Sequence, residues 1–390
     1  MLRSVLNDEA AGGKLIILFA VLALIVVNSP LRDIYNTLWH LNLSVGLGDV
    51  MLSQDLRHWV NEGLMAIFFL VVGLEIKREL INGELKDPKK AMLPMAAAVG
   101  GMVVPALIYA AFNMNSDTIH GWGIPIATDI AFAVAVLAFL SKRVPLSLKL
   151  FLLTLAIVDD IGAIFVIALF YAEIINYWYL ALSAVTVVAL WLVRRWITRR
   201  WAIIIVLLGV SLWITTHLSG IHASIVGAVL GLLAPVPRSA SAPSQSKRLE
   251  KLFLPISTFI VLPVFAFANA GVALSVDVFA NPNAQSVMIG VIAGLVVGKL
   301  VGIAGATWLM VKFGFATLPT GTNWAHIVGV SLIAGIGFTV SIFITGLAFS
   351  DNQELIEVAK VSVFAASGLA AGLGSLILWR ASKKDQDASA

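Results

Sequence analysis

The chain of 390 residues contains no cysteine, and only 12% of its residues are charged. The absence of cysteine excludes a disulfide framework. Soluble domains carry about twice this share of charge, roughly a quarter of their residues. Hydrophobic residues make up 59% of the chain, which is more apolar surface than a soluble protein of this size can bury. The composition therefore predicts a polytopic membrane protein.

Long apolar stretches, broken by short polar runs, follow one another along the chain. Stretches of this length are typical of transmembrane helices. They predict an all-α polytopic membrane protein with twelve spans in a single membrane domain over residues 1–390. The predicted spans are 13–28, 59–76, 91–112, 121–140, 147–171, 177–193, 201–217, 220–234, 255–273, 287–311, 324–349 and 355–378.

The basic residues indicate the orientation of these spans, because cytoplasmic loops carry an excess of lysine and arginine. With both termini inside, nearly all basic residues outside the spans fall on the inner side, and only Arg32 and Arg57 fall on the outer side. We therefore expect both termini in the cytoplasm. The same asymmetry accounts for the net charge of +4, so no nucleic-acid partner is expected.

Two polar segments are longer than the other connections. Residues 235–254 are rich in Ser, Ala and Pro and predict a flexible cytoplasmic loop. In the first outer loop, apolar residues alternate over residues 41–54, which predicts a small β-hairpin, with an ordinary loop as the alternative. Because a lone hairpin is only marginally stable in water, we expect it to pair, for example with the hairpin of a second subunit.

Four ionisable residues lie deep inside predicted spans: Asp129, Asp159, Asp160 and Lys299. A charge at this depth costs about 2.5–3.5 kcal/mol, so each one requires a reason. Asp159 and Asp160 point about 100° apart on a helix, and their mutual repulsion lets the pair hold protons near neutral pH and release them to a cation. A structural pair bonded to Ser or Thr is the alternative. For Glu62, near the end of a span, snorkelling to the surface is a sufficient explanation.

The fourth and eleventh predicted spans are interrupted, by Pro125 and by Gly335 and Gly337. Each is the middle of a group of three, spans 3–5 and 10–12, which predicts an inverted-repeat transporter with two broken helices. Half-helix ends carry partial charges, which Asp129 and Lys299 would offset. By itself, Asp129 could equally cap a kinked helix. Lys299 could also pair with one of the aspartates, carry a proton or snorkel.

Eight motifs together resemble those of the NhaA-type Na⁺/H⁺ antiporters, over roughly residues 8–380. They are FFLVVGLEIKREL, GGMVVPALIY, IPIATDIAFA, LAIVDDIGA, SGIHASIVG, LPVFAFANAGV, VGKLVGI and GIGFTVSIFI. Each is weak alone, but the set in this order is specific. The resemblance implies an electrogenic antiporter of the bacterial inner membrane that exports Na⁺ or Li⁺ in exchange for more than one proton, with no cofactor.

The resemblance also implies roles for individual residues. Asp160 would be the principal Na⁺ or Li⁺ ligand and Asp159 its coupling partner. Lys299 would pair with Asp159 in one state. Thr128 and Asp129 would line the crossing of the two broken helices. Na⁺ and Li⁺ are hard cations that prefer oxygen ligands, and carboxylates that bind either protons or the cation enforce exchange if the site opens to one side at a time.

Regulation by cytoplasmic pH and dimerisation through the outer hairpin are further implications of the resemblance. The regulatory residues would be Glu75, Arg78, Glu79, Glu250 and His222. Without the resemblance, the charge cluster could be a solvated helix end, and a lone histidine near a helix start is more often structural. Lys251 and Leu254 stand where familiar relatives carry histidines, so the activating pH is not carried over.

Three other classes of protein fit the sequence less well. An intramembrane aspartyl protease could use Asp129 and Asp160, but it gives no role to Asp159 or Lys299. A channel needs weak, multi-site binding. A transporter of organic anions would be opposed by Asp129. The sequence therefore predicts a secondary active transporter and not an enzyme.

Overall fold

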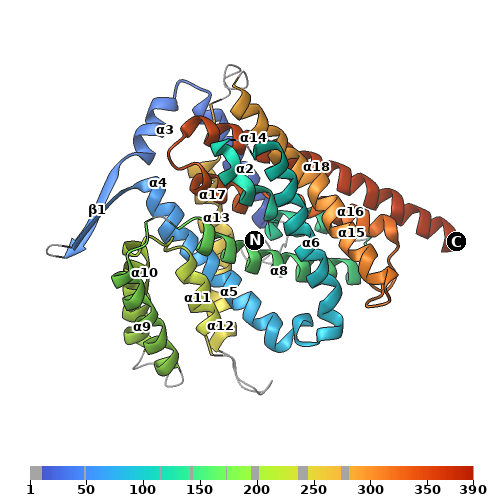
Figure 1. The fold of residues 1–390 in the computed structure, drawn as a ribbon, viewed down its shortest axis with the longest axis horizontal. Helices are drawn as coiled ribbons and strands as arrows, with labels where there is room; N and C mark the ends of the chain where they lie inside the picture. Colours follow the sequence, from blue (N-terminus) through green and yellow to red (C-terminus); the bar gives the residue numbers. More distant parts are fainter. Residues whose placement is uncertain are drawn as a thin grey trace. The chain divides into compact units, whose positions relative to one another are not determined.

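The computed structural model describes residues 11–47, 50–114, 116–140, 144–172, 174–194, 202–235, 245–273 and 281–389. Among these residues, helices form nearly the whole chain, and the only sheet has two strands (Figure 1). Five helices are long and apolar enough to cross a membrane, or up to eight if each bent pair of helices is one span. The structure therefore agrees with an all-α polytopic membrane protein.

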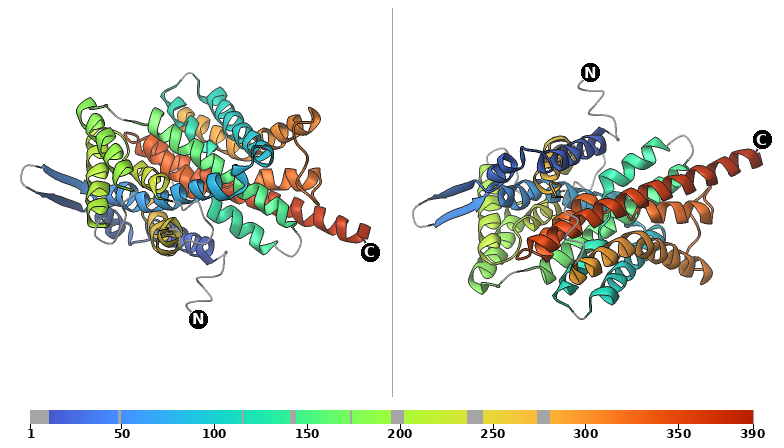
Figure 2. Two further views of the ribbon diagram at one scale, coloured as in Figure 1. Left: turned by 90° about the horizontal axis from the view of Figure 1, so that it is seen from below. Right: turned by 90° about the horizontal axis from the view of Figure 1, so that it is seen from above.

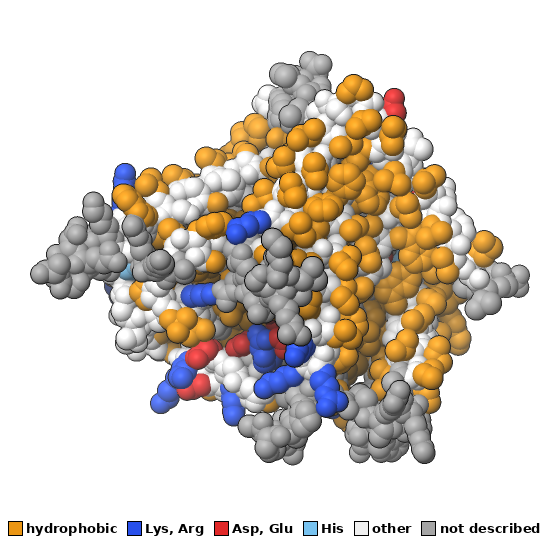
Figure 3. Space-filling view, turned by 180° about the vertical axis from the view of Figure 1, so that it is seen from behind, with side chains coloured by type: hydrophobic (Ala, Val, Ile, Leu, Met, Phe, Trp, Pro, Cys, Tyr) orange, Lys and Arg blue, Asp and Glu red, His pale blue; other side chains and the backbone are white. Residues whose placement is uncertain are grey.

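Large apolar side chains remain exposed along whole helices. On α10 (Ala202–Leu218), for example, Ile203, Val206, Leu207 and Val210 are all more than half exposed. Hydrophobic side chains likewise cover much of the face drawn in Figure 3. Such a surface would be unfavourable in water, but hydrocarbon solvates it, so it supports the assignment to a membrane.

The chain divides into two compact units, each made from segments that are distant in the sequence. The first unit comprises Met1–Asn28, Asn82–Ala163 and Ala270–Ala390, and the second comprises Ser29–Ile81 and Ile164–Asn269. Helix α8 (Leu146–Phe170) passes from the first unit to the second.

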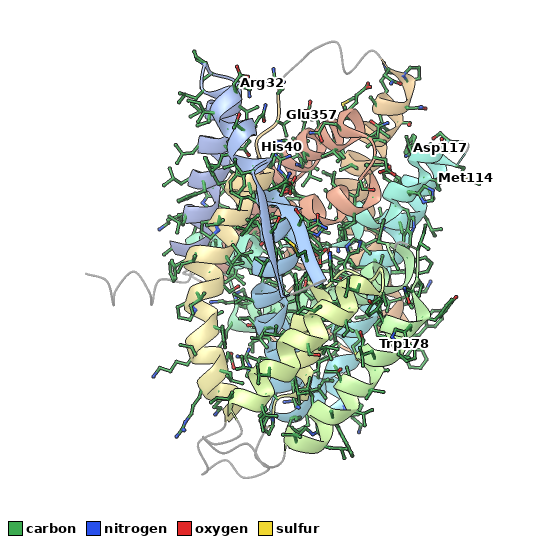
Figure 4. All side chains as sticks on the ribbon, turned by 90° about the vertical axis from the view of Figure 1, so that its left-hand side faces the viewer. Arg32, His40, Met114, Asp117, Trp178 and Glu357 are labelled. Atoms are coloured by element: carbon green, nitrogen blue, oxygen red, sulfur yellow. The ribbon has the colours of Figure 1, made fainter. Side chains whose placement is uncertain are left out.

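The helices of the first unit surround two broken pairs. Its elements are α2 (Ala11–Val27), η2 (Glu84–Lys86), α6 (Pro88–Asn113), η3 (Asp117–Ile126), α7 (Ile130–Phe139), the first part of α8, α14 (Pro282–Ala293), η7 (Gly294–Gly298), α15 (Lys299–Lys312), α16 (Trp324–Ile333), α17 (Phe338–Ala348) and α18 (Gln353–Ser389). Figure 4 labels Met114 and Asp117, which flank the turn between α6 and η3.

Helices α6 and α15 are in backbone contact in the first unit. A Cβ atom added at Gly100 would lie 2.3 Å from the carbonyl oxygen of Gly302, and one added at Gly302 would lie 2.1 Å from that of Gly100. Only glycine allows two helices to approach this closely. This contact holds α15, whose first residue is Lys299, directly against α6.

Both predicted interruptions are breaks in the structure. Helices η3 and α7 meet at 43° across residues 127–129, and α16 and α17 meet at 47° across residues 334–337. The first half of the fourth predicted span is a 3-10 helix, although an α-helix was the expectation. At the second break, a Cβ atom at Gly335 would lie 2.3 Å from the carbonyl oxygen of Leu295, so a larger residue does not fit there.

The second unit contains the two strands and the remaining helices. Its elements are α3 (Arg32–Trp39), β1 (Asn42–Leu47), β2 (Val50–Asp55), α4 (Leu56–His58), η1 (Trp59–Leu64), α5 (Met65–Asn82), the end of α8, α9 (Tyr177–Val193), α10, α11 (Ile225–Leu233), α12 (Gln245–Ile256), η5 (Ser257–Val261) and α13 (Leu262–Asn269). Helices α10 and α11 are separate, and Gly220 between them has φ +84°, a conformation that favours glycine.

The segment that predicts a hairpin contains an antiparallel pair of strands. The pairing runs from Asn42 opposite Asp55 to Leu47 opposite Val50, and residues 48–49 lie outside the described part of the chain. The ribbon projects away from the helices of its own unit (Figure 2).

The flexible loop predicted over residues 235–254 is too long. Helix α12 already begins at Gln245, and residues 236–244 lie outside the described part of the chain. Helix α12 is held to α5, because Glu250 on α12 forms an ion pair with Arg78 on α5.

Candidate ion site

A buried ion pair joins α8 to α15 in the first unit. Lys299 Nζ lies 2.5 Å from Asp159 Oδ2, and neither side chain is exposed at all. The lysine ammonium also donates to Thr128 Oγ1 at 3.0 Å and to the carbonyl oxygen of Ile126 at 2.6 Å. An ammonium has three protons to donate, so this environment satisfies all of them. The charge of Lys299 is therefore fully compensated.

The position of this ammonium follows from the first break. Ile126 is the last residue of η3, so its carbonyl belongs to the end of a helix that carries partial negative charge. Thr128 lies in the extended segment after it, where its hydroxyl is 2.6 Å from Asp159 Oδ2 and 2.8 Å from the carbonyl oxygen of Ala334. The hydroxyl has one proton and donates it to one of these two acceptors. The break thus supplies both a carbonyl and a hydroxyl to the ion pair.

Asp129 caps two half-helices at once. Its Oδ1 accepts from the backbone N–H of Phe132 at 3.1 Å, in the first turn of α7. Its Oδ2 accepts from the backbone N–H of Thr339 at 3.0 Å and from the Thr339 hydroxyl at 2.5 Å, in the first turn of α17. Both helix N-termini carry partial positive charge, which the buried carboxylate offsets.

Backbone contacts hold the two breaks against each other. The N–H of Asp129 donates to the carbonyl oxygen of Ile336 at 2.6 Å, and the hydroxyl of Ser341 donates to that of Ile124 at 2.7 Å. Backbone groups that a continuous helix would satisfy internally are satisfied here by the other broken helix. The predicted meeting point of the two broken helices is therefore a continuous hydrogen-bonded contact.

The two adjacent aspartates have different surroundings. Asp159 Oδ1 is buried and has no hydrogen-bond partner, whereas Oδ2 is shared by Lys299 and Thr128. Asp160 is 5% exposed on the next position of α8. Among the described residues, no group of three or more His, Asp or Glu side chains could hold a metal ion, so a cation here would also need hydroxyl, carbonyl or water oxygens.

The predicted regulatory residues fall into two places within the second unit. Arg78 lies 3.8 Å from a carboxylate oxygen of Glu75 and 3.5 Å from one of Glu79, and it also forms an ion pair with Glu250. The second place is that of His222, whose ring nitrogens lie against Glu62 and the carbonyl oxygen of Tyr171. Lys251 and Leu254, on α12, are exposed.

His222 and Glu62 form a buried pair that the sequence reading missed. Glu62 is only 2% exposed, so the interpretation of a snorkelling side chain is wrong. Its Oε1 lies 2.9 Å from His222 Nδ1, and its Oε2 accepts from the backbone N–H of Ser224 at 2.9 Å. His222 Nε2 lies 2.8 Å from the carbonyl oxygen of Tyr171. Because a carbonyl only accepts, His222 Nε2 donates to Tyr171, and the carboxylate of Glu62 faces the other ring nitrogen.

Apolar helices, two breaks and buried charges are together typical of a membrane transporter. The sequence profile of the family described as Na⁺/H⁺ antiporter 1 matches residues 3–378. The chain is 43% identical to Na⁺/H⁺ antiporter NhaA 1 of Clostridium beijerinckii, over 95% of this chain and 93% of that protein. It is 45% identical to the NhaA antiporters of Mesorhizobium japonicum and Pseudomonas putida, over 96% of this chain and 94% and 96% of those proteins. The chain therefore belongs to the Na⁺/H⁺ antiporter 1 family of multi-pass membrane transporters.

Proposed function

We propose that the protein is an electrogenic antiporter that exports Na⁺ or Li⁺ in exchange for more than one proton. The observation that carries this proposal is the Lys299–Asp159 pair, which lies where two broken helices meet. Family membership gives the transported ions, and the buried carboxylates of Asp159 and Asp160 give them a binding site.

The cation competes with protons and with the ammonium of Lys299 for these carboxylates. Asp160 is the principal ligand, and Asp159 and Thr128 supply further oxygens, including the unpartnered Oδ1 of Asp159. A cation beside Asp159 would lie close to the ammonium of Lys299, and like charges at this depth repel strongly. Cation binding therefore releases protons, and it also displaces Lys299 from Asp159. Exchange of one cation for more than one proton moves net charge, which makes transport respond to membrane potential.

Asp129 and Lys299 stabilise the breaks that make this site possible. Asp129 offsets the N-terminal ends of α7 and α17, and Lys299 offsets the C-terminal end of η3. Gly335 and Gly337 allow the second break. Alternating access would then move the helices on either side of the breaks relative to each other, as in other inverted-repeat transporters.

The topology that fits this mechanism has twelve spans in the inner membrane of a bacterium, with both termini in the cytoplasm. The asymmetry of lysine and arginine supports this orientation. The two breaks fall in the fourth and eleventh predicted spans. These spans would be the middle members of an inverted repeat of spans 3–5 and 10–12.

Regulation and assembly complete the proposal. The cluster of Arg78 with three glutamates would lie at the cytoplasmic end of α5 and respond to cytoplasmic pH, and His222, paired with Glu62, would contribute to this regulation. The ribbon of β1 and β2 would pair with its copy in a homodimer at the periplasmic side.

Everted membrane vesicles test the proposal through dequenching of a pH-sensitive dye when a cation is added. Na⁺ and Li⁺ should collapse an imposed pH gradient, whereas K⁺ and Ca²⁺ should not. Asp160→Asn should abolish the signal while the protein remains inserted. Asp117→Asn, a matched change at an exposed position, should leave it intact. Retained Na⁺-dependent dequenching in Asp160→Asn would refute the site.

A further inference from the structure

Helix η3 is an unusually long 3-10 helix, and its form sets the position of its last carbonyl. It comprises the ten residues from Asp117 to Ile126, whereas runs of more than three or four residues are uncommon in 3-10 form. A 3-10 helix rises about 2.0 Å per residue and an α-helix about 1.5 Å, so ten residues reach roughly 5 Å further in the 3-10 form. The carbonyl of Ile126, which accepts from Lys299 Nζ at 2.6 Å, therefore depends on this form.

The last turn of η3 is held at the ion site. Besides the contact of Lys299, the hydroxyl of Ser341 donates to the carbonyl oxygen of Ile124 at 2.7 Å. Pro125 packs closely against the first residue of η7, because a Cβ atom added at Gly294 would lie 2.7 Å from Pro125 Cβ. Holding one end does not keep a helix extended, so the 3-10 form requires that the other end of η3 be held as well.

Two buried side chains of α6, Tyr109 and Asn113, hold the first turn of η3. The hydroxyl of Tyr109 donates to the carbonyl oxygen of Thr118 at 2.8 Å, and the hydroxyl of Thr118 donates to Asn113 Oδ1 at 2.7 Å. Asn113 Nδ2 donates to the carbonyl oxygens of Tyr109 at 2.9 Å and Ser286 at 3.2 Å, which fixes the amide. A Cβ atom at Gly121 would lie 2.2 Å from the oxygen of the Tyr109 hydroxyl, so this contact requires glycine in η3.

We propose that Tyr109 and Asn113 are positioning residues of the ion site and act on it through η3. They hold the start of η3 so far from the ion site that the helix must keep its 3-10 form for the carbonyl of Ile126 to reach Lys299. This role rests on the antiport function proposed above. Without the anchor, η3 shortens toward an α-helix and withdraws the carbonyl from the ammonium.

The carbonyl of Ile126 matters most when a cation takes the place of Lys299 at Asp159. The acceptors that then remain for the ammonium are this carbonyl and the hydroxyl of Thr128. The carbonyl is the better acceptor for a cation, because it lies at the negative end of a helix. If it withdraws, Lys299 depends more on Asp159, and Na⁺ competes with the ammonium less well. Loss of the anchor therefore raises the Na⁺ concentration that transport requires.

The Na⁺ dependence of dequenching in everted vesicles tests this role. Tyr109→Phe and Thr118→Val each remove one hydroxyl link between α6 and η3 with little change of shape. Each should raise the half-maximal Na⁺ concentration about two- to tenfold, which corresponds to the net strength of one hydrogen bond, and leave the maximal response unchanged. Thr118→Ser keeps the hydroxyl and should behave as the parent does.

Ser286→Ala is the matched control, because the hydroxyl of Ser286 donates to the same oxygen of Asn113, at 2.9 Å, from α14 instead of η3. It should keep the half-maximal Na⁺ concentration of the parent. An unchanged or lower half-maximal concentration in Tyr109→Phe and Thr118→Val would overturn the proposal. An increase of the same size in Ser286→Ala would also overturn it, since the effect would then not pass through η3.

Melting temperatures of the purified protein give a second test that needs no transport. Thr118 lies about 16 Å from Ile126 along a 3-10 helix, and losses at sites this far apart normally add. Thr118→Val combined with Lys299→Ala should lower the melting temperature by less than the sum of the single losses, whereas Ser286→Ala with Lys299→Ala should be additive. Additive losses in the first pair would overturn the positioning role. A parent without any Na⁺ response would instead refute the proposed function, and non-additive losses would still show that the anchor positions the acceptor of Lys299.

Discussion

Replacing Lys299 with alanine should destabilise the first unit more than any surface change. The substitution removes all three hydrogen bonds of the ammonium and leaves the carboxylate of Asp159 buried with only Thr128 beside it. Removing one partner of a buried ion pair costs about 3–5 kcal/mol. Proton uptake by Asp159 would neutralise the orphaned charge and place the loss at the lower end of this range.

A double-mutant cycle isolates the contribution of the pair. Asp159→Asn alone leaves the ammonium of Lys299 buried without its carboxylate partner. The double variant, Lys299→Ala with Asp159→Asn, removes both charges and so leaves neither of them unpaired. We expect the double variant to be more stable than the sum of the two single losses predicts, by about 2 kcal/mol or more, because neither charge is then left unpaired. The measurements are the free energy of unfolding in mixed detergent micelles and the melting temperature. Strictly additive losses would show that the two side chains do not interact and would refute this reasoning.

Three further changes test the packing, the capping and the assembly. Gly302→Val should prevent folding or lower the melting temperature strongly, since its side chain would meet the backbone at Gly100, whereas Gly305→Val, with open space at the same helix, should be tolerated; equal effects would contradict the close contact. Thr339→Val should cost about 1.5–3 kcal/mol in unfolding free energy, because Asp129 loses a charge-assisted hydrogen bond; an unchanged melting temperature would exclude this role. Deletion of residues 43–52 should give monomers on detergent chromatography, and an unaltered dimer would refute pairing through the ribbon.

The positions of the breaks could be predicted from the sequence because their cause is local. Pro125 lacks a backbone donor, and Gly335 and Gly337 weaken a helix wherever they occur. The deep charges were equally visible, since an ionisable residue in an apolar stretch needs no structure to be noticed. The residues of each segment, taken alone, therefore predict both the irregular helices and the candidate ligands.

The pairing of these charges could not be predicted from the residues alone. Lys299 had several possible partners, and only the rotation of α8 and α15 about their axes makes Asp159 Oδ2 its acceptor. The second cap made by Asp129 depends on Thr339, 210 residues away. Glu62 was misread for the same reason, because His222 reaches it across 160 residues. Each case depends on tertiary packing, which no short sequence pattern records.

Proton release on cation binding tests the central claim most directly. Purified protein in weakly buffered detergent solution, with a pH-sensitive dye, is titrated with NaCl and, as a control for ionic strength, with choline chloride. If Na⁺ and protons compete for Asp159 and Asp160, then Na⁺ should release protons in a saturable manner, choline should release none, and Asp160→Asn should release few or none. Saturable Na⁺ binding without proton release would contradict the account.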